Sequence, residues 1–366
     1  MSRIRPILLL LLAGTGTLLQ PRCFAANDSL VAPQGFSSST QSNQRTSSDC
    51  ESAPEPFTGA LNFPSKYEGS GSARDELNVD AERRYKDATS SISSFEMGIA
   101  SLSSRYIQRG SDADVGCVLS WLDDWAEHGA LLGKAETHTG KSVRKWALAA
   151  ISTSYLRLQQ SRSAPLEKHA SERSRIEAWL RAIAVKVAAE WPVDAPINKI
   201  NNHFYWAAWS LVSTGTVLND RAMFNQGLEI YRIFERQITA DGVLPNEVGR
   251  RSRALGYHAY ALAPLAMIAT FAVANGEAVD TGPKSPLSRL AKTVFDGFQA
   301  PAGFVGLVGS KQEVSTNVAT NFSWLEPYCS IAACDASMTE FLQRNRPFKS
   351  TRLGGDLTTL FGTKQP

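Results

Sequence analysis

Residues 176–191, IEAWLRAIAVKVAAEW, decide the fold class of this chain of 366 residues. Apolar side chains recur there at steps of three and four positions, the spacing of one helix face. They are Ile176, Trp179, Leu180, Ile183, Ala184, Val187, Ala188 and Trp191. The pattern stops at Pro192, as helices commonly do before proline.

Two later stretches, 224–238 and 262–272, repeat this helical spacing, and no convincing run of alternating strand residues accompanies them. Short turns containing Gly, Pro or Asp separate the helical stretches. The sequence therefore predicts an all-α domain, which could be a bundle, a solenoid or a helical toroid. No clear sequence repeat decides among these three.

The first 25 residues have the three parts of a secretory signal peptide. Arg3 and Arg5 form a basic start, residues 7–19 are apolar, and Cys23-Phe24-Ala25 resembles a cleavage site. A membrane anchor would need about 20 apolar residues. Lipoprotein cleavage at Cys23 is disfavoured because Gln20-Pro21-Arg22 precede it. We expect residues 1–25 to be removed and the protein to be exported without stable membrane insertion.

Residues 26–56 are rich in Ser, Thr, Asn, Gln and Pro, so we expect them to be mostly disordered. Residues 57–366 would form the folded domain. The whole chain has 38 basic and 35 acidic residues, but three of the basic ones lie in the first 25. The remaining chain is balanced, whereas a nucleic-acid-binding protein would show a basic excess. No nucleic-acid partner is expected.

Four cysteines remain after the leader, an even number that favours two disulfides in an exported protein. Three pairings are possible. The simplest joins Cys329 to Cys334 and Cys50 to Cys117. A structural zinc site is the alternative, but no CxxC spacing supports it.

A first polar cluster lies in residues 200–210, INNHFYWAAWS. Helical spacing places Asn202, Tyr205 and Trp206 on one face, with His203 at its edge. A buried polar group without a partner costs roughly 1–3 kcal/mol. These groups therefore either satisfy one another in the core or face a cleft that holds a polar ligand.

A second cluster contains Arg250, Arg253 and Tyr257, which would share one face if the segment were helical. Guanidinium groups beside a tyrosine lower its pKa from about 10, which would make Tyr257 a usable general base. Gly256 is a poor helix residue and weakens the argument. The alternative is a solvated basic strip on the surface.

The polar, glycine-containing segment 64–74 forms a third cluster, with Lys66, Tyr67 and Arg74. Loops of this kind act as lids over binding sites or serve as plain connectors.

Other chemistries have weaker support in the sequence. His203 and His258 lack a third ligand at zinc spacing, so no metal site is expected, and His138 has a polar, surface-like context. Serine hydrolase, NTPase and dinucleotide motifs do not occur. A glycoside hydrolase with Glu247 and the Asp123-Asp124 pair is a minor option, because adjacent carboxylates diverge on a helix.

The strings NNHFYWAAW, KYEGSGSAR and RRSRALGYHAYALAPL resemble the periplasmic, mannuronate-preferring alginate lyases. The similarity extends from about Ser65 to Tyr328, and Tyr257 follows His203 by 54 positions. The resemblance implies an (α/α) toroid, an incomplete helical barrel with a deep cleft. It also implies β-elimination without a metal or other cofactor, acting on alginate or polymannuronate.

The resemblance further assigns roles. Asn202 and Arg250, with His203 beside them, would neutralise the substrate carboxylate, and Tyr257 would take the C5 proton and return one to the leaving oxygen. In β-mannuronate this hydrogen and O4 lie on the same side of the ring, so one residue can serve both steps. In guluronate they do not, and His203 would be the more plausible base.

The substrate-binding residues implied by the resemblance surround this centre. They are Lys66, Tyr67, Arg74, Trp146, Trp206, Arg253 and Tyr260.

The implied biological role is to clear stray alginate from the periplasm during synthesis, next to the proteins of an alginate secretion complex. Catabolism remains open. So do a lyase for another uronan and a non-catalytic polyuronate-binding scaffold of an export assembly.

Overall fold

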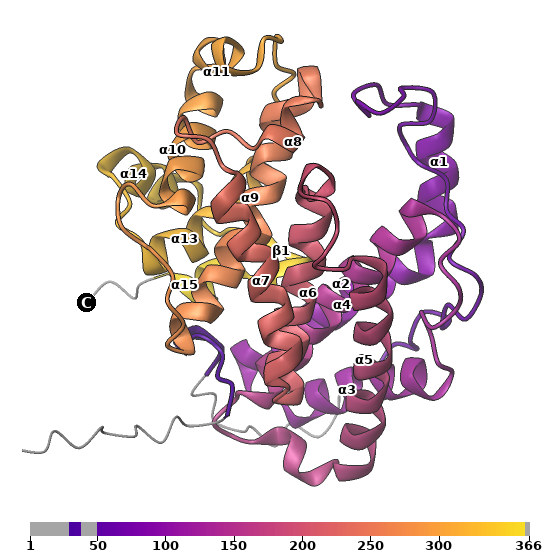
Figure 1. The fold of residues 1–366 in the computed structure, drawn as a ribbon. Coiled ribbons are helices and arrows are strands. Elements are labelled where there is room, and N and C mark those ends of the chain that lie inside the picture. Colours follow the sequence, from indigo (N-terminus) through magenta and orange to yellow (C-terminus); the bar gives the residue numbers. More distant parts are fainter. Residues whose placement is uncertain (1–28, 38–49, 363–366) are drawn as a thin grey trace, which may run out of the picture.

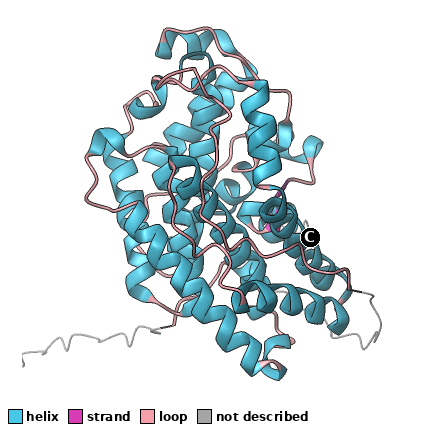
Figure 2. Ribbon diagram, turned by 90° about the vertical axis from the view of Figure 1, so that its right-hand side faces the viewer, coloured by secondary structure: helices cyan, strands magenta, loops and turns pink. Residues whose placement is uncertain are grey.

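The computed structural model describes residues 29–37 and 50–362, so the expected signal peptide lies outside the described residues. The chain is mostly helical over these ranges (Figures 1 and 2). The α-helices are α1 Val79–Ala88, α2 Ser90–Arg109, α3 Asp112–Glu127, α4 His138–Gln159, α5 Ala170–Glu190, α6 Asn202–Leu218, α7 Arg221–Gln237, α8 Pro245–Val248, α9 Ala254–Ala274, α10 Pro286–Gln299, α11 Pro301–Val308, α12 Val318–Phe322, α13 Leu325–Ile331, α14 Ala336–Asn345 and α15 Leu357–Phe361.

Helix α5 contains the stretch that predicted the fold class, and it ends at Glu190, two residues before Pro192. Its buried residues include Ile176, Trp179 and Ile183, as the three- and four-residue spacing predicts. The all-α prediction is therefore confirmed.

Helices α6 and α9 form the centre of the molecule. Helix α6 packs against α4, α5, α7 and α9, and α9 packs against α10 and α13 (Figure 1). Both helices are buried over most of their length. Their own buried residues lie on all sides of the helix rather than along one stripe. Each carries functional candidates at its N-terminal end, so the core fixes where these candidates lie.

The helical segment Arg251–Ala274 is long and apolar enough to span a membrane, but 78% of its most apolar window is buried in the fold. It therefore matches a core helix.

The C-terminal region adds a short antiparallel pair, β1 Lys349–Ser350 and β2 Gly355–Asp356, which the sequence did not indicate. The 3₁₀ turn Thr351–Leu353 joins the strands and packs against α4. Gly355 has φ +91°, and a Cβ there would lie 2.8 Å from Nη1 of Arg157. Glycine thus allows this tight turn, which carries Arg352 towards the centre of the molecule.

Residues 29–37 are packed against the domain, although they belong to the segment expected to be mostly disordered. The backbone N–H of Leu30 donates to Oδ1 of Asn219 at 2.7 Å. The Phe36 ring is buried edge-on against Phe271, with ring centroids 5.4 Å apart. Isolated apolar residues in a polar stretch are therefore enough to fix this part of the chain.

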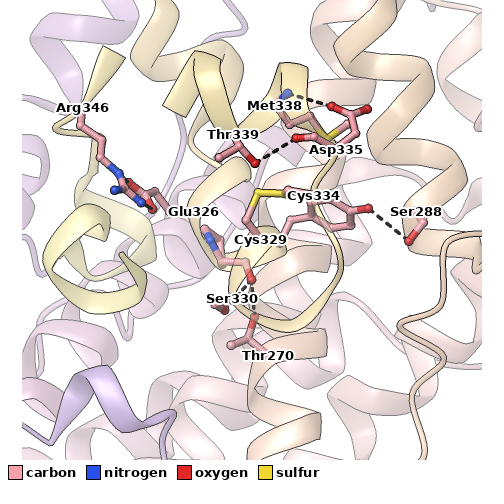
Figure 3. The surroundings of a disulfide bond; sticks show 12 residues. Thr270, Ser288, Glu326, Cys329, Ser330, Cys334, Asp335, Met338, Thr339 and Arg346 are labelled. Atoms are coloured by element: carbon pink, nitrogen blue, oxygen red, sulfur yellow. Dashed lines mark hydrogen bonds and ion pairs between the residues drawn. A yellow bond between two sulfur atoms is a disulfide. The ribbon is translucent and has the colours of Figure 1, made fainter. Parts of the chain in front are cut away.

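Both expected disulfides form. Cys50 pairs with Cys117, and Cys329 pairs with Cys334. Figure 3 shows the second bond beside the ion pair of Glu326 and Arg346. The Cys50 bond fixes the start of the described domain to α3.

Candidate active site

A cavity of about 490 Å³ lies where the N-terminal ends of α4, α6 and α9 approach one another. It is lined by the loop residues Lys66, Tyr67 and Arg74, by Trp146, Asn202, His203, Arg253, Tyr257 and Tyr260, and also by Ser65, Tyr85, His138, Thr139, Ser142, Gly256, Glu313, Ser315, Thr320, Asn321 and Arg352. The three sequence clusters are therefore brought to one site.

His203, at the second position of α6, is held on one side by α4. Its Nδ1 lies 3.0 Å from Nζ of Lys145 and 3.1 Å from Oγ of Ser142. The imidazole stacks on Trp191, with ring centroids 5.6 Å apart. Burial and then the Lys145 cation lower the pKa of His203 well below its usual value, so the imidazole is neutral near pH 7.

Asn202 is buried at the cavity wall. Its hydrogen-bond donors point to a protein carboxylate and not into the cavity. Its backbone N–H and its side-chain Nδ2 donate to Oε1 of Glu247 at 2.6 and 2.9 Å. Its Oδ1 has no hydrogen-bond partner among the described residues. The buried Glu247 carboxylate takes these protons in this structure, so the expected role of Asn202 as a donor to the substrate carboxylate stays a prediction.

Arg250 is buried behind Tyr257 and does not line the cavity. Its Nε lies 3.5 Å from Oε2 of Glu247, and its guanidinium lies 4.6 Å from the centre of the Tyr257 ring. The expected direct contact between Arg250 and a substrate carboxylate is therefore not supported by its position. It contributes positive charge from behind the wall.

The segment 250–257, considered in the sequence as a possible single helix, is not one helix. Arg251–Arg253 form a 3₁₀ turn, Arg251 has φ +50°, and α9 begins at Ala254. Arg250 nevertheless lies against Tyr257.

The pKa of Tyr257 is raised rather than lowered. Burial is the largest cause, and the neighbouring Tyr67 adds to it, while the Arg250 cation acts in the opposite direction. The expectation of a lowered pKa is wrong because it considered the cations and ignored burial. Tyr257 is a neutral phenol in the free protein.

Trp206 is a core residue and does not line the cavity, so its predicted contact with substrate is wrong. It is 3% exposed, and its Nε1 donates to the backbone oxygen of Tyr260 at 3.0 Å. Its place on the buried face of α6 explains this. Trp146 and Tyr260 do reach the cavity, with ring centroids 6.3 Å apart.

The loop of residues 64–74 closes one side of the cavity and is tied to the start of α9. Nε of Arg253 donates to the backbone oxygen of Asp75 at 2.6 Å, and its guanidinium lies 5.5 Å from the Tyr67 ring. Arg253 also lies 3.5 Å from Glu313 across the opening. Arg253 therefore connects the start of α9 to this loop through a hydrogen bond and a cation–π contact.

Sequence reasoning missed several cavity residues. Arg352 lies with its guanidinium 4.7 Å from the Trp146 ring and pairs with the buried Glu96. His138 is exposed towards the cavity, with its ring 4.6 Å from that of His203. Neither residue belongs to a motif that the sequence analysis identified. Only their distant partners in the fold reveal them.

The residues considered for a metal site and for a glycoside hydrolase are not brought together in the described part of the chain. Residues 29–37 and 50–362 contain no group of three His, Cys, Asp or Glu residues arranged to hold a metal ion. His258 is buried, where Nε2 accepts from the Leu244 N–H and Nδ1 donates to the Ala254 oxygen. Asp123 pairs with Arg175 at the surface, so no carboxylate pair with Glu247 forms.

The family model for alginate lyase matches residues 62–304. The chain belongs to the alginate lyase family. The alginate lyase of Azotobacter vinelandii is 41% identical over 348 residues, covering 94% of this chain and 93% of the relative. That of Pseudomonas putida strain W619 is 43% identical, covering 92% of both. The family makes this chain a polysaccharide lyase.

Solved structures in this family share the fold. A tyrosine-to-phenylalanine variant of alginate lyase A1-III, complexed with a tetrasaccharide, aligns with a TM-score of 0.74 at 22% identity, covering 92% of this chain and 98% of that one. Alginate lyase A1-III from Sphingomonas species A1 aligns with a TM-score of 0.68. The fold is therefore the (α/α) toroid expected from the resemblance.

Proposed function

We propose that this alginate lyase cleaves polymannuronate by β-elimination in the described cavity, with Tyr257 as the proton-transfer residue. The observation that carries the proposal is that Tyr257 and His203, 54 positions apart, line the same cavity. A phenol and a neutral imidazole can supply proton transfer and hydrogen bonding without a charged acid.

The charge of the cavity fits a polyanionic chain. Lys66, Arg74, Arg253 and Arg352 all line it, while the chain as a whole is nearly balanced. A local cluster of cations attracts uronate carboxylates and aligns the polymer without making the protein basic overall. The aromatic rings of Trp146 and Tyr260 give the sugar rings an apolar surface to pack on.

The proposed chemistry begins with the C5 proton of the uronate residue whose C4–O4 bond will break. Because Tyr257 is a neutral phenol in the free protein, its hydroxyl first gives its proton to solvent. The phenolate oxygen then takes the C5 proton. The electron pair forms the C4–C5 double bond, and O4 leaves with its pair. The phenol then returns the proton to O4, which restores the phenolate and releases two chains.

The C5 proton is acidic only if the adjacent carboxylate is neutralised by positioned donors. The half-buried His203 lines the wall and can donate to that carboxylate, and Arg250 supplies positive charge from behind Tyr257. Asn202 lines the wall, and its buried Oδ1 has no hydrogen-bond partner among the described residues. In this proposal Oδ1 accepts a substrate hydroxyl or a protonated carboxyl, and the amide donors hold Glu247.

Two variants of alginate lyase A1-III, one histidine-to-alanine and one tyrosine-to-phenylalanine, are complexed with a tetrasaccharide. By similarity, we propose that a short segment of the polymer fills the present cavity, with the scissile bond between His203 and Tyr257. The loop residues Lys66 and Tyr67 would then contact neighbouring uronates.

The test is ultraviolet absorbance of the protein without residues 1–25, incubated with polymannuronate, polyguluronate and pectin. Elimination creates a conjugated double bond, and hydrolysis or binding alone does not. The expected result is absorbance that rises fastest on polymannuronate. A rise only on another uronan keeps the chemistry and changes the substrate. A flat trace with retained binding overturns the proposal in favour of a scaffold.

We further propose that the protein acts in the periplasm, where it clears alginate that strays during synthesis. The leader of residues 1–25 and the two disulfides support export. Fractionation of the native cells should place the protein in the periplasmic fraction. Deletion of its gene should leave more uronan in that fraction during polymer production. Unchanged periplasmic uronan would contradict the clearing role.

A further inference from the structure

Lys145 is a fully buried lysine on α4, one helix away from the proposed chemistry. Its Nζ lies 3.5 Å from the centre of the Trp191 ring and 3.0 Å from Nδ1 of His203. The face of an indole stabilises a cation at this distance. A charge-assisted hydrogen bond holds its acceptor more strongly than a neutral one does.

The protons around Nδ1 of His203 can be followed one by one. The hydroxyl of Ser142 donates to the backbone oxygen of His138 at 2.9 Å, so its proton is already used. Lys145 can donate both to Nδ1 and to Oγ of Ser142, which lies 3.4 Å from Nζ. Burial lowers the pKa of Lys145 well below its usual value, but an Nζ hydrogen directed at Nδ1 makes Nζ the donor whether the group is an ammonium or an amine. With Nζ as the donor, Nδ1 accepts, and the imidazole proton lies on Nε2.

We infer that Lys145 is a positioning residue that fixes His203 in the tautomer with its proton on Nε2. Lys145 contacts no substrate in this scheme and acts only through the imidazole. The inference rests on the proposed function for its catalytic meaning, but the tautomer itself is a property of the free protein.

The consequence concerns specificity. An imidazole with its proton on Nε2 can donate to the uronate carboxylate, but that nitrogen cannot take a proton from C5. His203 is then excluded as the base that guluronate would require. Of the two residues proposed for proton transfer, Tyr257 then remains as the base, and it serves the substrate whose C5 hydrogen and O4 share one side of the ring. Lys145 thereby contributes to selection of polymannuronate over polyguluronate.

The test is a ¹⁵N NMR spectrum of the histidine rings in the labelled protein at pH 7, with His203 assigned from its loss in His203→Gln. The expected spectrum has a protonated Nε2, identified by its coupling to both ring protons, and an unprotonated Nδ1. A protonated Nδ1 in the wild-type protein would overturn the inference without any variant.

Variants distinguish the effect of Lys145 on the His203 tautomer from the effects of its neighbours. Lys145→Met should produce a mixture of the two tautomers, whereas Ser142→Ala should leave Nε2 protonated. Lys141→Met removes a lysine one turn earlier on the same helix and serves as the matched control. An unchanged tautomer in folded Lys145→Met would contradict the inference. If that variant does not fold, the wild-type spectrum still decides whether Nδ1 is the acceptor.

Kinetics connect the tautomer with catalysis. Lys145→Met should lower kcat on polymannuronate roughly 10–100-fold, as the loss of partners that orient a histidine commonly does, with a smaller change in KM. A shifted tautomer with unchanged kcat would overturn the positioning role. A wild-type protein inactive on every uronan would instead refute the proposed function and leave the tautomer result standing.

Discussion

Asn202 and Glu247 are hydrogen-bonded beneath the cavity, where the Glu247 carboxylate accepts both the backbone N–H and the side-chain amide of Asn202. Glu247 is fully buried, and Arg250 lies on its other side at 3.5 Å. One carboxylate therefore links the start of α6 to the turn before α9. It fixes the relative position of His203 and Tyr257.

Replacing Glu247 with alanine should harm both stability and activity. The substitution leaves the Arg250 charge and the Asn202 donors buried without their acceptor, a change that costs about 3–5 kcal/mol. Chemical denaturation and lyase rates would measure the two effects. Glu247→Gln keeps an acceptor oxygen and should retain more of both. Equal stability of the alanine variant and the wild type would show that Glu247 does not hold the start of α6 to the turn before α9.

The rate on polymannuronate should rise with pH between about 6 and 9. The pKa of Tyr257 lies above its ordinary value of about 10, mainly because of burial, so the phenolate fraction grows with pH throughout this range. The pKa of His203 is far lower, so its neutral form does not change. The measurement is kcat/KM as a function of pH. A rate that falls across this range would argue against Tyr257 as the base.

His258 should make folding stability depend on pH. Burial lowers its pKa to about 4 in the folded protein, against about 6.5 when unfolded. As the pH falls below 6.5, the unfolded chain binds a proton that the folded chain cannot, so stability is lost until about pH 4. The loss should approach about 3 kcal/mol.

His258→Gln is the variant that isolates this effect, because carboxylates also contribute to acid unfolding. Denaturant titrations at pH 7.5 and pH 5 should show a smaller difference for the variant than for the wild type. An identical difference in both proteins would mean that His258 is not responsible.

Helical spacing in the sequence was sufficient to predict the fold class, because a stretch such as 176–191 buries the residues that its period selects. Local patterns failed where tertiary contacts decide the outcome. Trp206 was placed in the cleft because a helix face alone does not reveal which neighbour covers it. The pKa of Tyr257 was misjudged because burial depends on the loop of residues 64–74, far away in the sequence.

Site residues that lie outside a recognisable motif could not be found from one sequence. Lys145 is part of an ordinary helical pattern, and only its contact with His203, 58 positions away, distinguishes it. Arg352 lies after the family motifs in the sequence and reaches the cavity through a turn that requires glycine. By contrast, Asn202, His203 and Tyr257 belong to motifs dense enough to identify, and they do line the cavity.

Arg352→Ala should weaken substrate binding more than the chemical step. Its guanidinium lies over Trp146 in the cavity, where it can meet a uronate carboxylate. Loss of one charge-assisted contact, worth about 1.5–3 kcal/mol, predicts a rise in KM of roughly 10–100-fold. The substitution also leaves the buried Glu96 unpaired.

The matched control for Arg352 is the double variant Glu96→Gln with Arg352→Ala, which removes the unpaired charge. If the double variant regains wild-type KM, Arg352 serves stability and does not bind substrate. If KM stays high while stability recovers, the binding role holds.

The central claim is that Tyr257 transfers the proton in an elimination. The most direct measurement compares Tyr257→Phe with the wild type by absorbance on polymannuronate, while calorimetry records the binding of a mannuronate tetrasaccharide to both. Removing the phenolic oxygen should lower kcat by about 10²–10⁴-fold and leave binding nearly unchanged, since general acid–base groups contribute on this scale. A variant that forms the unsaturated product at close to the wild-type rate would contradict the account.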